Sequence, residues 1–280
     1  MRGQVPPRAT GVLMGLTATL HPFSFHPTYQ KLHRLPLDEK VAALRSPEVR
    51  AALLAEETTL PAGILVHEIV TGFHKMFRLG DPANYEPSPD ESFESLAAVG
   101  GISPYEIALD TMLENDGHAL IYHPLFNYGS GNLDFVAEML NHPHTTMGLS
   151  DGGAHCGVIS DVSFPTTLLA HWGRDRDHGR LPVEQLVKMQ TQETAELVGL
   201  GDRGVLAPGY KADVNIIDFD HLYAHEPRVE YDLPAGGRRL VQRANGYVVT
   251  IVSGRVAFRD GEPTGRLDGR LVRGAQPAPA

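Results

Sequence analysis

The stretch MGLSDGGAHCG, residues 147–157, ends a short apolar run at an aspartate, which two glycines and a histidine follow. Asp-Gly and Gly-Gly are common turn signals, so one interpretation of Asp151 is an ordinary turn residue. The other is a reactive carboxylate, because α/β folds bind ligands at the carboxyl ends of parallel strands. The segments around this stretch decide between the two.

The segments just before this stretch alternate between strand and helix patterns. Residues 119–122 and 145–150 are predicted as short apolar strands, and Asn132 is placed to cap a helix between them. The apolar residues of that helix recur on one face, at Leu133, Val136, Ala137 and Leu140. Strands joined by a helix are typically parallel neighbours, so Asp151 is predicted to follow a parallel strand.

The first part of the chain predicts one strand and several short helices. An apolar run over residues 12–20 is typical of a strand or another buried segment. One helix follows Asp38 as its N-cap. The next has Ser46 as its N-cap and Pro47 at its first position, where a missing N–H costs nothing.

Two further signals lie between residues 81 and 117. Residues 81–91 (DPANYEPSPDE) are rich in proline and polar residues and are predicted as an exposed loop. Ser103 and Glu106 form the capping-box pattern of a helix that ends near residues 115–117.

The last third of the chain changes from helical to β patterns. Helices are expected near Phe164, after Pro182 and over residues 192–199. Short β runs with turn signals follow at residues 212–218, 247–254 and 255–261. Residues 253–255 (SGR) are predicted as a hairpin turn, so this part is expected to form a small antiparallel unit.

Composition excludes several classes of protein. The chain has 280 residues, of which 42% are hydrophobic and 21% charged, as in globular proteins. Its net charge of −10 argues against a nucleic-acid partner. One cysteine, Cys156, excludes an intrachain disulfide framework, and no run approaches the roughly 20 apolar residues of a membrane span. We therefore expect a soluble, cytoplasmic protein without a membrane partner.

Four segments resemble the C-terminal half of the amidohydrolase superfamily, and within it the D-aminoacylase (N-acyl-D-amino-acid deacylase) branch. They are GLSDGGAHCG (148–157), SFPTTLLAHWGRDR (163–176), MQTQETAELVGLGDRGVLAPGYKADVNIIDFD (189–220) and VVTIVSGRVAFRDGEPTGRLDGRLVRG (248–274). The third segment is common to many amidohydrolases. The order SDG, SFP and GEPTGR narrows the resemblance to the branch.

The resemblance implies an α/β fold, namely the C-terminal part of a metal-dependent (β/α)₈ TIM-like barrel followed by a small β-sandwich segment. It places an amidohydrolase barrel part with an insertion at residues 1–200, the β-sandwich segment at 201–270 and a loose tail at 271–280. A complete barrel needs eight βα units, roughly 250 residues. We find two strands and a third near residues 12–20, so the chain is expected to be incomplete at its N-terminus.

The resemblance also implies the roles of two residues. Asp151 matches the family aspartate that contacts the metal, acts as general base toward the bound water and passes the proton to the leaving amine. The metal is expected to be zinc or another divalent ion. His155 matches the histidine of the family's DGxxH pattern and is expected to contact the substrate, with a plain loop histidine as the alternative. Cys156 is expected to be a structural neighbour.

Most of the family's metal ligands have no matching position. The HxH pair, the bridging Lys, Glu or Cys and two further histidines are absent. The His-Pro-His at residues 142–144 is no substitute, because an extended chain puts His144 about 23 Å from Asp151. It is expected instead to cap the preceding helix. Other candidate pocket residues are His21, His26, His67, His74 and His123.

The predicted reaction is hydrolysis of an N-acyl amide in a small molecule. The loop CGVISDVS, residues 156–163, lacks the arginine with which characterised D-aminoacylases bind the substrate carboxylate. A cyclic amide or another N-acyl compound is therefore an alternative substrate. A further alternative is a non-catalytic chain, which is either a truncated product or one half of a two-chain enzyme that needs an N-terminal partner. A homo-oligomer is also possible.

Overall fold

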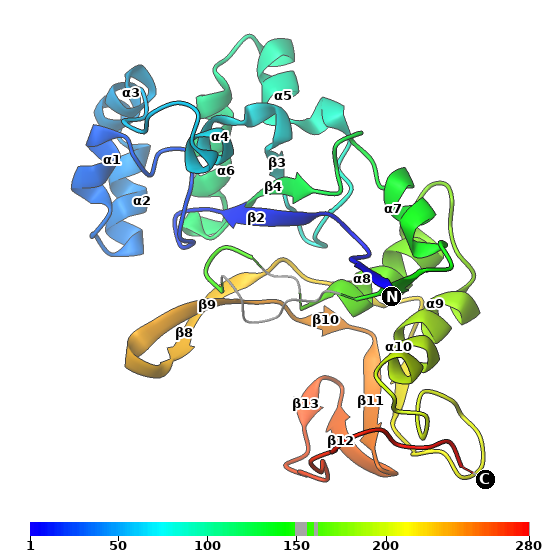
Figure 1. The fold of residues 1–280 in the computed structure, drawn as a ribbon. Coiled ribbons are helices and arrows are strands. Elements are labelled where there is room, and N and C mark those ends of the chain that lie inside the picture. Colours follow the sequence, from blue (N-terminus) through cyan, green and yellow to red (C-terminus); the bar gives the residue numbers. More distant parts are fainter. Residues whose placement is uncertain (149–155, 160–161, 280) are drawn as a thin grey trace.

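The chain forms an α/β structure of short helices and short strands (Figure 1). The computed structural model describes residues 1–148, 156–159 and 162–279. The helices are α1 (Pro27–Leu32), α2 (Leu37–Arg45), α3 (Pro47–Ala55), α4 (Leu65–Thr71), α5 (Phe93–Gly100), α6 (Pro104–Leu113), α7 (Asp134–Leu140), α8 (Phe164–Ala170), α9 (Val183–Gln190) and α10 (Gln192–Leu197). The strands are β1 (Gly3–Val5), β2 (Thr10–Met14), β3 (Phe77–Arg78), β4 (Ile121–Phe126), β5 (Thr145–Met147), β6 (Val214–Ile217), β7 (Tyr223–Ala224), β8 (Arg228–Leu233), β9 (Gly237–Val241), β10 (Ala244–Asn245), β11 (Tyr247–Val252), β12 (Arg255–Arg259) and β13 (Glu262–Pro263).

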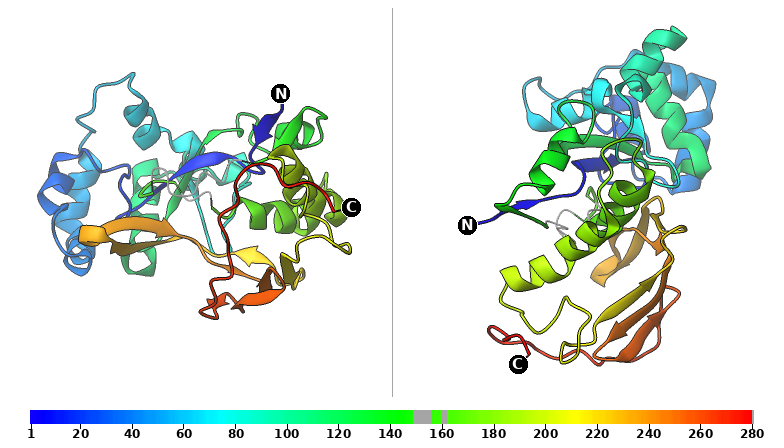
Figure 2. Two further views of the ribbon diagram at one scale, coloured as in Figure 1. Left: turned by 60° about the horizontal axis from the view of Figure 1, so that its bottom comes forward. Right: turned by 90° about the vertical axis from the view of Figure 1, so that its right-hand side faces the viewer.

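The strands pair into small sheets. The central sheet has the order β2-β4-β3 and is antiparallel, and β1 pairs in parallel with β5. A four-stranded sheet has the order β13-β12-β11-β6, and two-stranded ribbons join β8 to β9 and β10 to β7. Helices α1–α6 gather on one side of the central sheet, and the later strands lie on the other (Figures 1 and 2).

The predicted parallel pairing of the strands around α7 is wrong. β4 is bonded to β2 on one edge and to β3 on the other, so it has no free edge for β5. β5 pairs with β1 instead, with Thr145 opposite Gly3 and Met147 opposite Val5. The narrower prediction that Asp151 follows a parallel strand agrees with this pairing.

The predicted helix starts are largely confirmed. Ser46 and Pro47 begin α3, and α6 has the full capping box. In that box Ser103 Oγ accepts a bond of 3.3 Å from the N–H of Tyr105, and Glu106 accepts one of 3.0 Å from the N–H of Ser103. Asp38 is not an N-cap, because α2 already begins at Leu37.

The C-terminal β unit is antiparallel, as predicted. β11 pairs with β12 on one side and with β6 on the other. The hairpin turn has left-handed backbone at both central residues, with φ of 52° at Ser253 and 77° at Gly254. The closed barrel, the β-sandwich and the division into residues 1–200, 201–270 and 271–280 remain predictions. Within the predicted loose tail, Gln276 pairs with Leu200.

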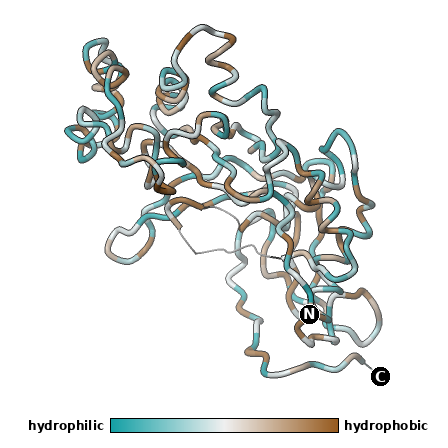
Figure 3. Tube along the Cα trace, turned by 45° about the horizontal axis from the view of Figure 1, so that its top comes forward, coloured by the Kyte–Doolittle hydropathy of each residue, from teal (hydrophilic) through white to brown (hydrophobic). Residues whose placement is uncertain are grey.

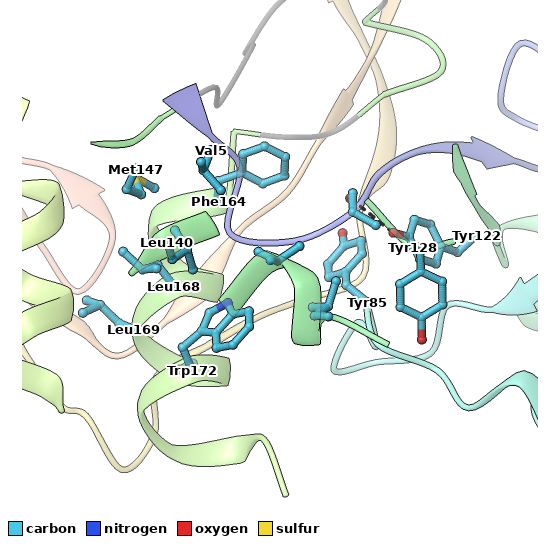
Figure 4. Close-up of a cluster of buried hydrophobic side chains, with 14 of the residues drawn as sticks. Val5, Tyr85, Tyr122, Tyr128, Leu140, Met147, Phe164, Leu168, Leu169 and Trp172 are labelled. Atoms are coloured by element: carbon cyan, nitrogen blue, oxygen red, sulfur yellow. Dashed lines mark hydrogen bonds between the residues drawn. The ribbon is translucent and has the colours of Figure 1, made fainter. Parts of the chain in front are cut away.

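The central sheet separates two apolar cores. Because successive side chains of a strand point to opposite faces, Val12 and Met14 of β2 face one core and Leu13 faces the other. The first core lies under α1–α6, and the second surrounds Trp172, whose indole N–H donates a bond of 2.6 Å to the carbonyl of Pro7. Figure 4 shows the second core. Its labelled members include Leu140, Met147, Phe164, Leu168 and Leu169.

The helices differ in how much of their surface is buried. α2 and α9 bury only some of their residues, whereas α8 is buried over six of its seven residues. Figure 3 shows apolar and polar residues interspersed along the chain. In the part of the chain that the structure describes, no helix is long and apolar enough to cross a membrane.

The close approach of β2 to β4 yields a test. A Cβ at Gly11 would lie 2.5 Å from a ring carbon of Tyr122 and 2.7 Å from the carbonyl oxygen of His123. We expect Gly11→Ala to lower the free energy of unfolding by about 1–3 kcal/mol, because the main chain of β4 must shift. Urea unfolding measures this. The matched control is Gly3→Ala, where no atom lies within 4 Å of the new Cβ. Equal stability of the two variants would contradict this account of the sheet.

Candidate functional site

Asp151 and His155, the two predicted site residues, lie outside the described residues. The chain on either side of them is described, and hydrogen bonds to other parts of the chain fix both flanking segments. At the N-terminal end, β5 is paired with β1, and the N–H of Gly148 donates a bond of 3.1 Å to the carbonyl of Val5.

At the C-terminal end, residues 156–158 lie between the loop after β2 and strand β9. The carbonyl of Cys156 accepts a bond of 2.6 Å from the N–H of Leu240. The carbonyl of Gly157 accepts bonds from the N–H and the hydroxyl of Thr19, at 3.1 and 2.8 Å. The carbonyl of Val158 accepts one of 2.8 Å from the N–H of Leu13. These bonds fix the position of residues 156–158, which directly follow the predicted catalytic segment.

Cys156 is half-buried, and its thiol donates to the carbonyl of Arg238 at 3.8 Å. This contact agrees with the structural role predicted for Cys156.

Three of the candidate histidines are buried and neutral. His21 is 3% exposed, its Nδ1 accepts a bond of 3.2 Å from the N–H of Phe23, and burial, with Lys40 and His26 nearby, lowers its pKa to about 3. Burial, with Lys75 nearby, lowers the pKa of His123 to about 4. Burial also lowers the pKa of His26, against the opposing influence of Glu56.

The other candidate pocket histidines differ in exposure, and the described residues contain no metal site. His67 is half-buried beside Thr71, and His74 is exposed. Across residues 1–148, 156–159 and 162–279, no three His, Cys, Asp or Glu side chains could hold a metal ion. His142 and His144 are exposed, and the N–H of His142 donates to the carbonyl of Met139 near the end of α7. The C-cap of α7 is Asn141, whose N–H donates to the carbonyls of Ala137 and Met139, so the His-Pro-His follows the cap and does not form it.

A cavity of about 610 Å³ contains an ionic network that the sequence did not predict. Glu86 accepts bonds from His171, from Arg176 at 3.0 Å and from the N–H of Leu133 at 2.8 Å. Burial alone would raise the pKa of Glu86, but the bonds from His171 and Arg176 outweigh it and lower the pKa to about 2. Arg176 also donates to Asp134 and lies 4.7 Å from the ring centroid of Trp172.

The prediction that residues 81–91 form an exposed loop holds for the two ends of the segment, and this network corrects it for the middle. Tyr85 and Pro87 are buried, and the side chain of Glu86 is 10% exposed. Loop composition could not show this, because the partners of Glu86 lie more than 40 residues away along the chain. The only sequence signal for this network was the mixture of positive and negative residues in the HWGRDR segment, residues 171–176.

The comparisons with known proteins agree on one family. The sequence model of the amidohydrolase family matches residues 4–258 of this chain. A dihydroorotase of Lactobacillus acidophilus is 28% identical over 244 residues, or 80% of this chain and 55% of that protein. An S-triazine hydrolase of Gordonia rubripertincta is 30% identical over 141 residues, or 48% of this chain and 28% of that protein.

Solved structures of D-aminoacylase are also similar. One covers 82% of this chain and 44% of the D-aminoacylase chain, with 23% identity and a TM-score of 0.41. The amidohydrolase resemblance predicted from the four sequence segments is thus confirmed at the level of the family. The chain spans about half the length of the dihydroorotase and of the D-aminoacylase chain.

The buried histidines predict acid sensitivity. Below pH 6.5 the unfolded chain takes up protons on His21 and His123, whereas the folded chain does not until about pH 3 and pH 4. The free energy of unfolding therefore decreases as the pH falls. Each histidine contributes a loss of about 2 kcal/mol between pH 7.5 and 5. We expect His21→Gln to flatten this part of the profile in thermal unfolding. The exposed His118→Gln is the control, and profiles that fall equally steeply in both variants would contradict the account.

The ionic network predicts unequal effects of its two carboxylates. Glu86→Gln leaves the guanidinium of Arg176, 2% exposed, without its main partner, so we expect a loss of about 3 kcal/mol in the free energy of unfolding. Asp134→Asn removes an exposed partner of the same guanidinium and should cost much less, because water screens an exposed ion pair. Denaturant unfolding at pH 7 measures both. The stabilisation by Glu86 should be present above pH 4.5 and lost toward pH 2.

Proposed function

The chain belongs to the amidohydrolase family, and from this membership we propose that it serves the hydrolysis of an amide C–N bond in an N-acyl amino acid. One observation carries the proposal. The family match over residues 4–258 includes the SDGGAH segment, whose two ends are held by β1, β2 and β9. Kinship to D-aminoacylase supports the N-acyl-D-amino acid as the substrate class, in line with the sequence prediction.

Asp151 is the proposed general base. Its carboxylate accepts a proton from the attacking water as the C–O bond forms at the acyl carbon. It then gives the proton to the leaving nitrogen as the C–N bond breaks. A carboxylate suits both steps, because it accepts the proton at neutral pH and becomes an acid once protonated. His155, four residues further on, is proposed to contact the substrate.

A divalent metal, zinc by the sequence resemblance, is part of this proposal for the whole protein. One solved D-aminoacylase structure concerns a binuclear metal centre in that protein. The described residues of this chain do not offer three ligands for such an ion.

A second substrate class is favoured by one observation. The dihydroorotase match covers 80% of this chain, which supports a dihydroorotate-like cyclic amide. Rates measured with a panel of N-acyl amino acids and cyclic amides distinguish the two classes. A cytoplasmic location, and action together with a second polypeptide or as a homo-oligomer, likewise remain proposals.

The general-base role is tested by Asp151→Asn. We expect turnover of N-acetyl-D-amino acids to fall by about 10²–10⁴-fold, because an amide cannot accept the proton. Release of the free amine from the metal-supplemented chain measures the rate, with N-acetyl-L-amino acids and dihydroorotate as comparison substrates. Asp90→Asn, an exposed aspartate in the 81–91 segment, is the control. Wild-type turnover in Asp151→Asn, or no turnover of any of these amides by the parent chain, would end the proposal.

A further inference from the structure

A second cavity, of about 620 Å³, lies between the last helices and the C-terminal sheet. Its walls come from β5, α8, the α9–α10 pair and the strands β6 and β11 (Figure 1). Among the described residues, no side chain lines both this cavity and the one that contains Glu86. Cavities of roughly 300–1,000 Å³ are the usual size of small-molecule sites in proteins.

The walls of this cavity are joined to one another. The hydroxyl of Thr166 on α8 and that of Tyr247 on β11 are hydrogen-bonded at 2.9 Å. β11 pairs with β6, where Tyr247 lies opposite Ile217. The loop at Gly204 packs against the junction of α9 and α10, because a Cβ at Gly204 would lie 2.8 Å from the main chain of Thr191. Since these contacts form when the chain folds, the cavity exists before any ligand binds, as is usual for small-molecule sites.

Most of the lining is apolar. Met147 and Leu169 line the cavity and belong to the second core, at one edge of which they lie (Figure 4). Val187 and Leu206 also line it, and these side chains are 42% and 83% exposed. Apolar side chains that stay exposed around a cavity are typical of ligand-binding grooves. An occupant would therefore remove apolar surface from water that folding leaves exposed.

The polar groups of the lining favour an uncharged ligand. Asn215 accepts a bond of 2.9 Å from the hydroxyl of Thr250 through its amide oxygen, so its NH₂ group remains a donor. Gln190, at the end of α9, adds a second amide, which can both donate and accept. The carboxylate of Asp213 also lines the cavity, but Lys211 and the N–H of Ser253, at 2.9 Å, already donate to it. The described lining thus offers hydrogen bonds, while its one carboxylate is already paired.

We propose that this cavity binds an uncharged small molecule with an apolar body and one amide or carbonyl group. The body packs against the apolar lining, and the amides of Gln190 and Asn215 bond the polar group. An anion is disfavoured, because it would lose its hydration beside the carboxylate of Asp213. Gly148, whose N–H bonds to the carbonyl of Val5, also lines the cavity, so the occupant contacts the β1–β5 pair.

Displacement of a neutral dye tests the class of ligand. Nile red, which is uncharged and fluoresces in apolar surroundings, is bound to the full chain and displaced by 4-phenylbutanamide or by 4-phenylbutanoate. The two competitors share one apolar body and differ in charge. We expect one dye molecule to bind per chain. The amide should displace it at a concentration at least about tenfold lower than the acid, because the acid must give up its hydration.

Two matched variants locate the site. Leu206→Asp places a charge in the lining and should weaken dye binding by about tenfold or more. Leu267→Asp is the control, because Leu267 is 96% exposed and is not part of the described lining. Since both leucines are exposed, neither change should prevent folding. Gln190→Met should weaken the amide while leaving dye binding unchanged, because it removes a hydrogen bond and keeps an apolar side chain.

Three results would overturn the site. They are binding of several dye molecules per chain, equal effects of the Leu206 and Leu267 changes, and displacement by the acid at the same concentration as by the amide. No turnover enters these measurements, so their outcome is independent of the proposed function.

Discussion

The pairing of β2 with β4 is the constraint on which the rest of the structure depends. It brings residues more than 100 positions apart into register, with Val12 opposite His123 and Met14 opposite Ile121. The alternation of side chains on these two strands then assigns each residue to one of two cores. Since neither core could close without this sheet, the helices before β4 and the elements after α7 are both placed by it.

The same strand also places the candidate site. The N–H of Leu13 in β2 and the N–H of Thr19 after it bind the main chain of residues 156–158, and β9 binds that segment from the other side. A strand of the first core thereby fixes the end of the segment that holds Asp151 and His155. Packing of the sheet and geometry of the site both depend on β2, because this strand pairs with β4 and also binds the segment of residues 156–158.

Local signals in the sequence predicted local structure well. The capping box at Ser103 and the hairpin turn at Ser253 and Gly254 involve only neighbours in the chain, so composition and spacing suffice. The partner of β4 was not predictable in this way. Its strand pattern is compatible with either direction of pairing, and the choice depends on which strands reach its edges. The site was predictable only as motif residues, since Glu86 acquires its role from partners that are distant in the sequence.

The charges around Glu86 are matched within the chain. The buried guanidinium of Arg176 pairs with Glu86 and Asp134, and Glu86 also accepts bonds from His171 and from the N–H of Leu133. The network therefore ties the 81–91 segment to α7 and to the turn after α8. A structural role explains this arrangement, because each of these charges gains its partner when the chain folds, and a buried charge without a partner would be destabilising.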